Sequence, residues 1–308
     1  MKKKRIIETV HQDARMSITQ VSSLSDDIRR LLKRYNVRPK KKRGQSFLSS
    51  HSMAKDIVDL AELSGQEEVL EIGGGFGVLT QRIAEKARHV HVIEIDPSLV
   101  KALRDVAKDF NNVSIIEGDA LTVDLPRVST IISNLPYSIS SEITFRILKE
   151  MEFEVAILMY QKEFASRLVA NPGTSEYSRL TINVQYYAEV EEILGVPADM
   201  FYPVPAVDST VVRMVPRSKG PFARDESVFH WMIGGIYPYP NKNLRKALRI
   251  WFRNLRIDKN LSDEVLKRLE GVLKGDERLR SINLNELVSL ADVLLELIEI
   301  RTITDPRV

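Results

Sequence analysis

Cysteine is absent from the 308 residues of this sequence, which excludes disulfides, thiolate metal sites and thiol nucleophiles. Histidine is scarce, with five residues scattered along the chain, so we expect no metal site. No apolar run reaches the ~18–20 residues that a membrane-spanning helix needs, and the basic N-terminus lacks the apolar stretch of a signal peptide. These absences predict a cytoplasmic protein that has no membrane contact.

Charge is unevenly distributed along the chain. The formal net charge is only +3, yet residues 1–43 carry 14 Lys and Arg against 4 Asp and Glu, a net of +10. The remaining residues carry 31 basic against 38 acidic side chains, a net of −7. A basic arm on a mildly acidic body favours a polyanionic partner, although such an arm can also serve solubility alone.

Apolar strands alternate with helical segments from about Gly44 onward. The expected strands lie at 68–72, 90–95, 113–117, 130–133 and 155–160, and the expected helices at 52–63, 79–87, 97–110, 141–150 and 163–169. Another helix is expected at 25–35, within the basic arm. Alternating strands and helices predict an α/β fold with a mostly parallel sheet that is covered on both faces.

The pattern changes after about Val190. Two further strands, at 190–194 and 210–215, are close enough to pair antiparallel, and the proline-rich stretch between them is unsuited to a strand interior. A linker-like stretch at 216–221 precedes a segment with a wholly helical pattern. The sequence therefore predicts a basic N-terminal extension (1–43), a Rossmann-like domain (44–216) and a small all-helical domain (217–308).

A glycine-rich stretch, Glu71-Ile72-Gly73-Gly74-Gly75-Phe76-Gly77, follows the first expected strand. Glycines allow a tight turn and a close approach of the backbone to a ligand. Glu94 ends the next strand, about 20 residues on, where such folds place a carboxylate on a ribose. Asp119 ends the third strand and can accept from an adenine amine. A ligand with a ribose and an adenine but no pyrophosphate suits S-adenosylmethionine better than NAD.

The fourth expected strand ends in Asn134-Leu135-Pro136-Tyr137, beside the expected cofactor crevice. The exocyclic nitrogen of adenine is a poor nucleophile because it is conjugated to the ring. Its methylation needs two hydrogen-bond acceptors, which the side-chain carbonyl of Asn134 and the main-chain carbonyl of Leu135 can supply. Pro136 stiffens the turn, and Tyr137 offers a stacking face worth about 1–3 kcal/mol per base. The simpler alternative is an Asn-Pro turn with a packing tyrosine.

Four stretches of the sequence resemble motifs of the KsgA-type ribosomal RNA adenine dimethyltransferases. They are Gly44-Gln45-Ser46-Phe47-Leu48, the glycine loop continued by Val78-Leu79-Thr80, the Asn-Leu-Pro-Tyr turn, and Phe201-Tyr202-Pro203-Val204-Pro205-Ala206-Val207-Asp208-Ser209. They follow the family's order and spacing over about residues 40–255. Ser46, Gly74 and the Asn241-Lys242-Asn243 run depart from common family residues, and the long N-terminal extension is more typical of archaeal members.

The resemblance implies a Rossmann-like class I S-adenosylmethionine-dependent methyltransferase. The implied reaction is dimethylation of the N6 amino groups of two adjacent adenosines near the 3′ end of small-subunit rRNA, within a pre-ribosomal small subunit, and we expect a monomer. The implied cofactor site comprises Ser46, Leu48, Gly73, Gly75, Glu94, Asp119, Ala120 and Asn134. The implied catalytic site, which would hold a flipped adenine, comprises Asn134, Leu135, Pro136, Tyr137 and Phe201. Phe201 is also readable as a core residue.

Lys242 to Arg256 contains six basic side chains and no acidic one. On a helix the basic residues fall within about a 100° arc, with the apolar ones opposite. One face would then pack while the other meets phosphates, unless the segment is an ordinary amphipathic surface helix. The residues expected to contact RNA are Lys41, Lys42, Arg43, Lys242, Arg245, Lys246, Arg249 and Arg253.

Three alternatives share parts of this pattern. A DNA adenine methyltransferase would need a larger target-recognition domain than the expected helical part of about 90 residues. A large-subunit rRNA dimethyltransferase is a close relative, but the Asn-Leu-Pro-Tyr form and the Phe201–Ser209 stretch favour the small-subunit enzyme. A non-catalytic RNA-binding assembly factor on the same fold would not require the intact turn and cofactor residues. A cytosine carbon-5 methyltransferase is excluded because its chemistry needs a cysteine.

Overall fold

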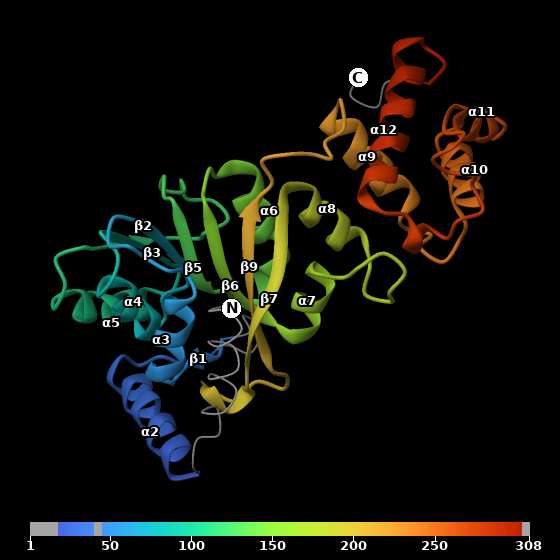
Figure 1. Cartoon of the computed structure of the whole chain (residues 1–308). Helices are drawn as coiled ribbons and strands as arrows, with labels where there is room; N and C mark the ends of the chain where they lie inside the picture. The colour runs from blue at the N-terminus through green and yellow to red at the C-terminus, as the bar shows by residue number, and fades with distance from the viewer. Residues whose placement is uncertain (1–17, 40–44, 304–308) are drawn as a thin grey trace, which may run out of the picture. The chain divides into compact units, whose positions relative to one another are not determined.

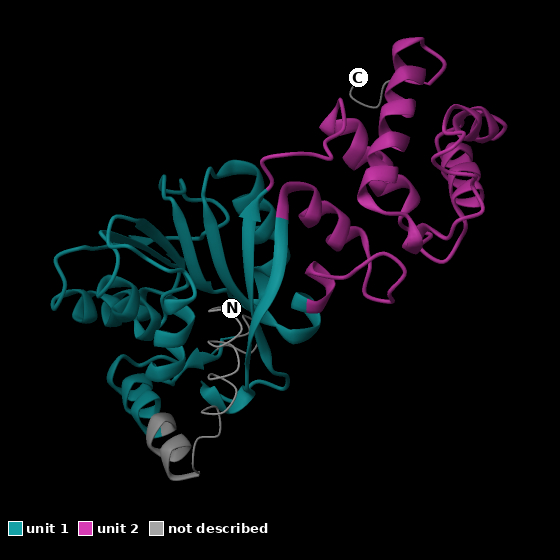
Figure 2. Cartoon of the chain, in the orientation of Figure 1, with its two compact units in different colours: residues 1–165, 189–216 teal, residues 166–188, 217–308 magenta. Residues whose placement is uncertain are grey.

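The computed structural model describes residues 18–39 and 45–303 (Figure 1). The chain divides into two compact units, one formed by residues 1–165 and 189–216 and the other by residues 166–188 and 217–308 (Figure 2). Across these described ranges, no helix is both long and apolar enough to cross a bilayer.

The first unit is built on a seven-stranded sheet of order β4-β3-β2-β5-β6-β9-β7. Its strands are β2 (Glu68–Ile72), β3 (His89–Glu94), β4 (Val113–Glu117), β5 (Thr130–Asn134), β6 (Val155–Gln161), β7 (Ala188–Val196) and β9 (Ser209–Pro216). The strands from β2 to β6 pair in parallel, and β9 is antiparallel to β6. Strands β2, β5 and β6 are buried along almost their whole length, as expected for parallel strands that are covered on both faces.

The helical elements of the first unit are α2 (Ile18–Arg34), α3 (His51–Asp59), α4 (Val78–Ala84), α5 (Pro97–Ala107), η2 (Tyr137–Ile139), α6 (Ser140–Glu150), η3 (Ala198–Met200) and most of α7 (Lys162–Leu168). Local sequence explains where several begin. The Ser50 side chain accepts from the Met53 amide at 3.2 Å to cap α3, and Asp96 caps α5 ahead of a proline in its first turn. The expected α/β fold is confirmed.

The strand order creates a topological switch point between β2 and β5. From β2 the chain proceeds to β3 and β4 on one side of the sheet, and β5 then pairs with β2 on its other side. Ligands of open α/β sheets bind in the crevice outside the carboxyl ends of the strands at such a point. The glycine loop after β2 and the turn after β5 therefore flank one crevice.

A second, two-stranded sheet was not expected from the sequence. Strand β1 (Phe47–Leu48) pairs antiparallel with β8 (Phe201–Tyr202), with Phe47 opposite Tyr202 and Leu48 opposite Phe201. The Ser49 amide and hydroxyl extend the pairing through bonds to the Met200 carbonyl at 2.9 and 2.8 Å. This sheet joins the first resemblance motif to the last one.

The basic extension is not separate from the first unit throughout its length. Ile28 and Val37 are buried, and they share an apolar cluster with Phe47, Phe76 and Leu99. Residues 26–39 therefore belong to the folded unit rather than to an independent arm, because their apolar side chains have partners on it. The expected RNA-binding residues Lys41, Lys42 and Arg43 lie outside the described residues.

The second unit is helical and has its own core. Its elements are α8 (Arg179–Tyr187), α9 (Glu226–Ile236), α10 (Leu244–Asn254), α11 (Leu261–Arg268), η4 (Leu279–Ser281) and α12 (Leu284–Glu299). Helix α8 was not expected. Residues 166–188 belong here rather than with 44–216 because Tyr177 donates to the Ile282 carbonyl at 3.0 Å and Tyr186 stacks on Phe229 at 4.3 Å.

Candidate active site

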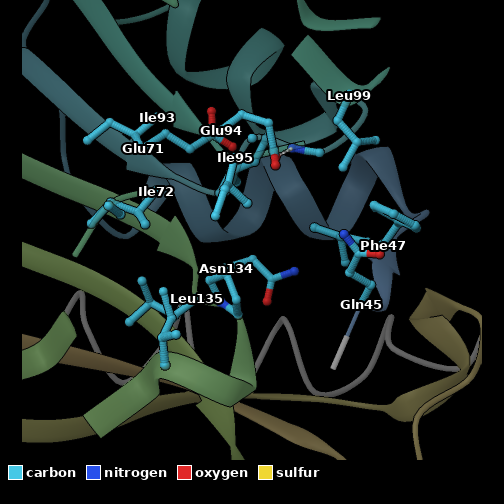
Figure 3. A pocket seen from close by; sticks show the side chains of 18 of the residues that line it. Gln45, Phe47, Glu71, Ile72, Ile93, Glu94, Ile95, Leu99, Asn134 and Leu135 are labelled. Carbon is cyan, nitrogen blue, oxygen red and sulfur yellow. Dashed lines mark hydrogen bonds between the residues drawn. The ribbon is translucent and has the colours of Figure 1, made fainter. Parts of the chain in front are cut away.

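A cavity opens at the switch point of the first unit (Figure 3). Its wall combines the segment before α3, the glycine loop, the ends of β3, β4 and β5, and the turn that follows β5. The lining residues are Gln45 to Leu48, Glu71 to Phe76, Val78, Leu79, Ile93 to Ile95, Leu99, Gly118 to Ala120, and Asn134 to Ile139. The cavity therefore gathers all eight of the expected cofactor residues, Asn134 included.

The glycine loop leaves room for a ligand because its backbone lacks side chains. Gly73 and Gly75 have φ values of 79° and 58°, in the region that favours glycine. A Cβ atom on Gly75 would lie 3.2 Å from the ring of Phe47, and one on Gly74 would lie 2.4 Å from Val92. The loop thus keeps its shape only with glycines at these positions.

Glu94 lies at the end of β3 with its carboxylate already anchored. One oxygen accepts from the Gly75 amide at 3.0 Å and the other from the Asp96 amide at 2.9 Å. Burial raises its pKa, and the backbone donors act in the opposite direction. Each oxygen keeps a second lone pair, so Glu94 can accept from the two hydroxyls of a ribose.

Asp119 and Ala120 form the adjoining loop after β4. The Asp119 side chain accepts from the Leu121 amide at 2.9 Å through Oδ1. Arg146 on α6 holds this loop from outside the cavity, because its guanidinium donates to the Ala120 carbonyl at 2.5 Å and to Glu150 at 2.8 Å. Only 14% of the Arg146 side chain is exposed, and nothing in the sequence pattern signalled its role.

Glu71 is a buried carboxyl in the cavity wall to which the sequence analysis gave no role. It is 2% exposed, and its Oε2 accepts from the Thr80 hydroxyl at 2.5 Å. Burial raises its pKa to about 8, and the nearby carboxylate of Glu94 acts in the same direction. Glu71 is therefore protonated at neutral pH, so the wall of the cavity carries one negative charge fewer than the sequence suggests.

Asn134 ends β5 with its side-chain oxygen buried and unpaired. Among the described residues, Asn134 Oδ1 has no hydrogen-bond partner. Figure 3 shows its amide, Glu94 and Phe47 around the same cavity. A buried acceptor without a donor costs about 1–3 kcal/mol, and such a group in a native structure calls for an explanation. A ligand N–H in the cavity would satisfy it.

Tyr137 lies two residues beyond Leu135 and is held at its hydroxyl end. The Tyr137 hydroxyl is 2.8 Å from the Ser209 hydroxyl, and burial raises its pKa. The amide of Leu135 bonds to the Met159 carbonyl at 3.3 Å, and Ile139 donates to the Pro136 carbonyl at 3.1 Å. The turn is thus fixed at several points, and Tyr137 lines the cavity with a fixed ring.

The segment before α3 forms the remaining wall. Leu48 is buried against the cavity, and the Ser46 hydroxyl donates to the Pro203 carbonyl in a short bond. The hydroxyl hydrogen of Ser46 is therefore used by the 201–205 segment. The hydroxyl oxygen and the backbone of Ser46 stay available for the expected contact with the cofactor.

Phe201 requires a correction. It is 1% exposed, packs in the apolar cluster that contains Leu48 and Met200, and is not among the residues that line the cavity. The β1–β8 pairing turns its ring into the core, so it cannot present a face to a ligand in this conformation. The structure therefore favours its alternative interpretation as a core residue, and of the two aromatic residues expected in the catalytic site only Tyr137 lines the cavity.

The basic helix forms in the second unit as expected, as α10, with Asn243 as its cap. Two of its cations share an acidic partner, however. Arg245 and Arg249 both bind Asp263 of α11, at 2.9 Å for Arg249, and these two arginines hold the pKa of Asp263 below its usual range. Lys242, Lys246 and Arg253 are exposed. These three form no ion pair with another described residue.

With this geometry established, the comparisons with known proteins are decisive. A family model described as ribosomal RNA adenine dimethylase matches residues 36–282. The chain belongs to this family. It is therefore an enzyme, a ribosomal RNA adenine methyltransferase of the class I S-adenosylmethionine-dependent fold, as the sequence motifs implied.

Curated relatives agree with the family assignment. The chain is 40% identical to a probable ribosomal RNA small subunit methyltransferase A of Methanosarcina acetivorans. The alignment spans 276 residues and covers 88% of this chain and 98% of the relative. The chain is 45% identical over 221 residues to the protein of the same name from Methanococcoides burtonii, which covers 72% and 81%. Archaeal relatives fit the archaeal type expected from the sequence.

Solved structures give the same result. A dimethyladenosine transferase from Plasmodium falciparum is similar with a TM-score of 0.71 and 27% identity, over 82% of this chain and 98% of that one. The 23S rRNA methyltransferase ErmE is similar with a TM-score of 0.61 and 27% identity, over 80% and 99%. The fold class is thereby confirmed.

Proposed function

We propose that this enzyme transfers methyl groups from S-adenosylmethionine to the N6 amines of two adjacent adenosines near the 3′ end of small-subunit rRNA. The observation that supports it most is the unpaired Oδ1 of Asn134, buried in the cavity beside the glycine loop. An adenine amine carries the N–H that this oxygen lacks.

The cavity fits S-adenosylmethionine in its donors, its acceptors and its open glycine backbone. Glu94 would accept from the ribose hydroxyls, Asp119 would accept from the adenine amine of the cofactor, and Gly73 and Gly75 would leave space for its chain. The bound cofactor supplies an electrophilic methyl group. Apolar residues such as Leu48 and Leu99 exclude water from this space, which strengthens each polar contact inside it.

The turn after β5 would orient the target base. Asn134 Oδ1 and the Leu135 carbonyl accept the two N–H groups of the amine and draw its nitrogen towards a tetrahedral shape. Tyr137 stacks on the base, with its ring position fixed by Ser209. After the first transfer one N–H remains to be held, so the same pair of acceptors can orient the amine for a second methyl group. No strong base is required if the proton leaves after transfer.

Contacts with the rRNA backbone are proposed for the exposed cations of α10. Lys242, Lys246 and Arg253 would neutralise phosphates, with the salt dependence that such contacts produce. Arg245 and Arg249 are expected to contribute less than these three, because they share the single negative charge of Asp263. RNA of folded shape suits a sequence-independent cationic surface of this kind.

A small-subunit target is favoured over a large-subunit one. Relatives named small subunit methyltransferase A reach 40–45% identity, whereas the 23S rRNA enzyme reaches 27%. The motif stretches that distinguish the two groups, the Asn-Leu-Pro-Tyr turn and the 201–209 segment, are both intact.

The direct test is methylation of small ribosomal subunits from a strain that lacks the modification. Purified enzyme and S-adenosylmethionine should produce dimethyladenosine at two adjacent positions, detected by mass spectrometry of the rRNA. Large subunits treated in parallel should remain unmodified. Modification of large subunits only, or of neither, would refute the proposed target.

Asn134→Ala tests the mechanism within the same assay. The turnover rate should fall by about two to three orders of magnitude, as when one preorganised polar group is removed from an active site. The affinity for S-adenosylhomocysteine, measured by calorimetry, should change little because the proposed role of Oδ1 is to hold the target amine. An equal loss of cofactor affinity would show that Asn134 acts on the cofactor instead.

A further inference from the structure

Helix α2 packs against the outside of the cofactor cavity, although it precedes the 36–282 range that the family model matches. Its residue Ile28 is only 3% exposed, and Leu31 and Leu32 pack against the same apolar cluster. That cluster contains Phe47, Phe76 and Leu99. All three of these residues also line the cavity. Helix α2 thus forms a second layer behind one wall of the site.

Aromatic rings connect the helix to the cavity. The rings of Phe47 and Phe76 lie 4.7 Å apart, and that of Tyr35, just after α2, lies 6.4 Å from Phe76. The Phe47 ring also lies next to Gly75, where a Cβ atom would be 3.2 Å from it. A shift of Phe47 or Phe76 would therefore change the space beside the glycine loop directly.

Polar contacts fix the helix segment at two separate places. The Tyr35 hydroxyl donates to Asp105 of α5 at 2.7 Å, and α5 carries Leu99. At the other place, the Arg29 guanidinium lies 5.1 Å from the centre of the Tyr202 ring, a cation–π contact. Tyr202 pairs with Phe47 in the small sheet. The segment therefore bridges α5 and β8 across the cavity wall.

The small sheet alone gives Phe47 weak support. Strands β1 and β8 have two residues each, and a pair of such short strands is marginal without packing on another element. Helix α2 supplies part of that packing, since Ile28, Leu31 and Leu32 belong to or pack against the apolar cluster that contains Phe47. Without it, the Phe47 ring would lose part of its support.

We infer that Ile28 and Tyr35 are positioning residues that hold the Phe47 and Phe76 wall closed and so increase the retention of the cofactor. This inference rests on the proposed function only in that the cavity binds S-adenosylmethionine and its product. It gives α2 and Tyr35, which precede the range matched by the family model, a role in the cofactor site. This role is separate from any contribution of the basic residues to RNA binding.

The test uses the full chain and calorimetric titration with S-adenosylhomocysteine, without RNA. Ile28→Ala should raise Kd about tenfold, equivalent to about 1.4 kcal/mol, and raise KM for S-adenosylmethionine similarly while kcat at saturation stays within about twofold. Ile233→Ala is the matched control, because Ile233 of α9 is also buried but lies in the core of the second unit, none of whose described residues lines the cavity. It should lower thermal stability without changing Kd.

Tyr35→Phe provides a milder variant that removes only the bond to Asp105. It should raise Kd about two- to threefold with little loss of thermal stability. Unchanged Kd values in both Ile28→Ala and Tyr35→Phe, while the wild type binds S-adenosylhomocysteine, would overturn this inference alone. Absence of binding by the wild type would overturn the proposed cofactor and this inference together.

Discussion

The protonated state of Glu71 makes a prediction about stability that can be worked out from the structure. The carboxyl is fully enclosed, its pKa is raised by burial to about 8 from a reference of 4.5, and its hydrogen-bond donor is Thr80. Between these two pKa values the folded chain binds a proton at Glu71 that the unfolded chain releases. Stability therefore falls as pH rises through this window.

The size of the effect follows from the two pKa values. Proton uptake at Glu71 on folding costs about 1 kcal/mol at pH 5 and about 3 kcal/mol at pH 7. Glu71→Gln removes this cost because the amide is neutral at every pH, and its carbonyl can still accept from Thr80. The advantage of the variant over the wild type should therefore grow by about 2–3 kcal/mol between pH 5 and pH 7.

The assay is urea denaturation of both proteins at pH 5 and at pH 7. Both tryptophans, Trp231 and Trp251, lie in the second unit, so their fluorescence does not report on the first. Far-ultraviolet circular dichroism, or amide exchange of β2, follows the unit that contains Glu71. Glu142→Gln, at an exposed carboxylate on α6, should show no growing advantage. A pH-independent difference between wild type and Glu71→Gln would mean that the buried carboxyl is ionised, which would refute the reasoning.

Three further predictions concern binding. Gly75 has a φ of 58°, and a Cβ atom there would lie 3.2 Å from an aromatic ring, so Gly75→Ala should destabilise the protein by about 1 kcal/mol or more. Calorimetry should also show weaker binding of S-adenosylhomocysteine. An unchanged Kd would show that the loop tolerates a side chain. Arg146→Gln should raise KM for the cofactor without changing kcat, because the Arg146 guanidinium holds the loop after β4. Glu150→Gln removes only the ion pair with Arg146 and should match the wild type. Equal effects of the two variants would assign the role to the ion pair. Lys246→Glu with Arg253→Glu should weaken RNA binding and lower the slope of log affinity against log salt by about 1 per removed contact, and an unchanged slope would remove α10 from the interface.

The sheet and most of the cavity could be predicted from sequence because their signals are local. Strand β2, the glycine loop and α4 are contiguous, and the pattern of apolar strand, glycines and helix fixes their geometry. The carboxyl ends of parallel strands meet at one edge, so Glu94, Asp119 and Asn134 were predicted to approach one another although each lies on a different strand. The structure places all three in one cavity.

The features of the site residues that the sequence did not reveal all depend on contacts between distant segments. Phe201 is buried because β8 pairs with β1, about 150 residues earlier, which no local pattern signals. Arg245 and Arg249 were expected to face phosphates, and the sequence did not show that Asp263 of the next helix forms ion pairs with both. A helical arc shows which residues share a face, but it does not show which residues of a neighbouring helix that face meets.

Helix α8 was missed for a related reason. Residues 179–187 carry apolar side chains around much of the helix, with Leu180, Ile182, Val184 and Tyr186 all buried. Such a segment lacks the polar face from which a surface helix is recognised. Its side chains are buried by the helical unit, whose Phe229 stacks on Tyr186, so the segment belongs to that unit although strand β7 follows it directly.

Three of the polar groups that cost stability in the first unit lie at the cavity. Asn134 Oδ1 is buried without a donor among the described residues, and Glu71 and Glu94 are carboxyls whose pKa values burial raises. An apolar core of the same shape would avoid each of these costs, which together amount to several kcal/mol. Buried polar groups are expected to gather at the switch point if ligand binding offsets the free energy that their burial costs. Departures from the ordinary rules of core packing are expected at functional sites. The hydroxyls of a ribose and the amine of a target base would present the donors that Glu94 and Asn134 need.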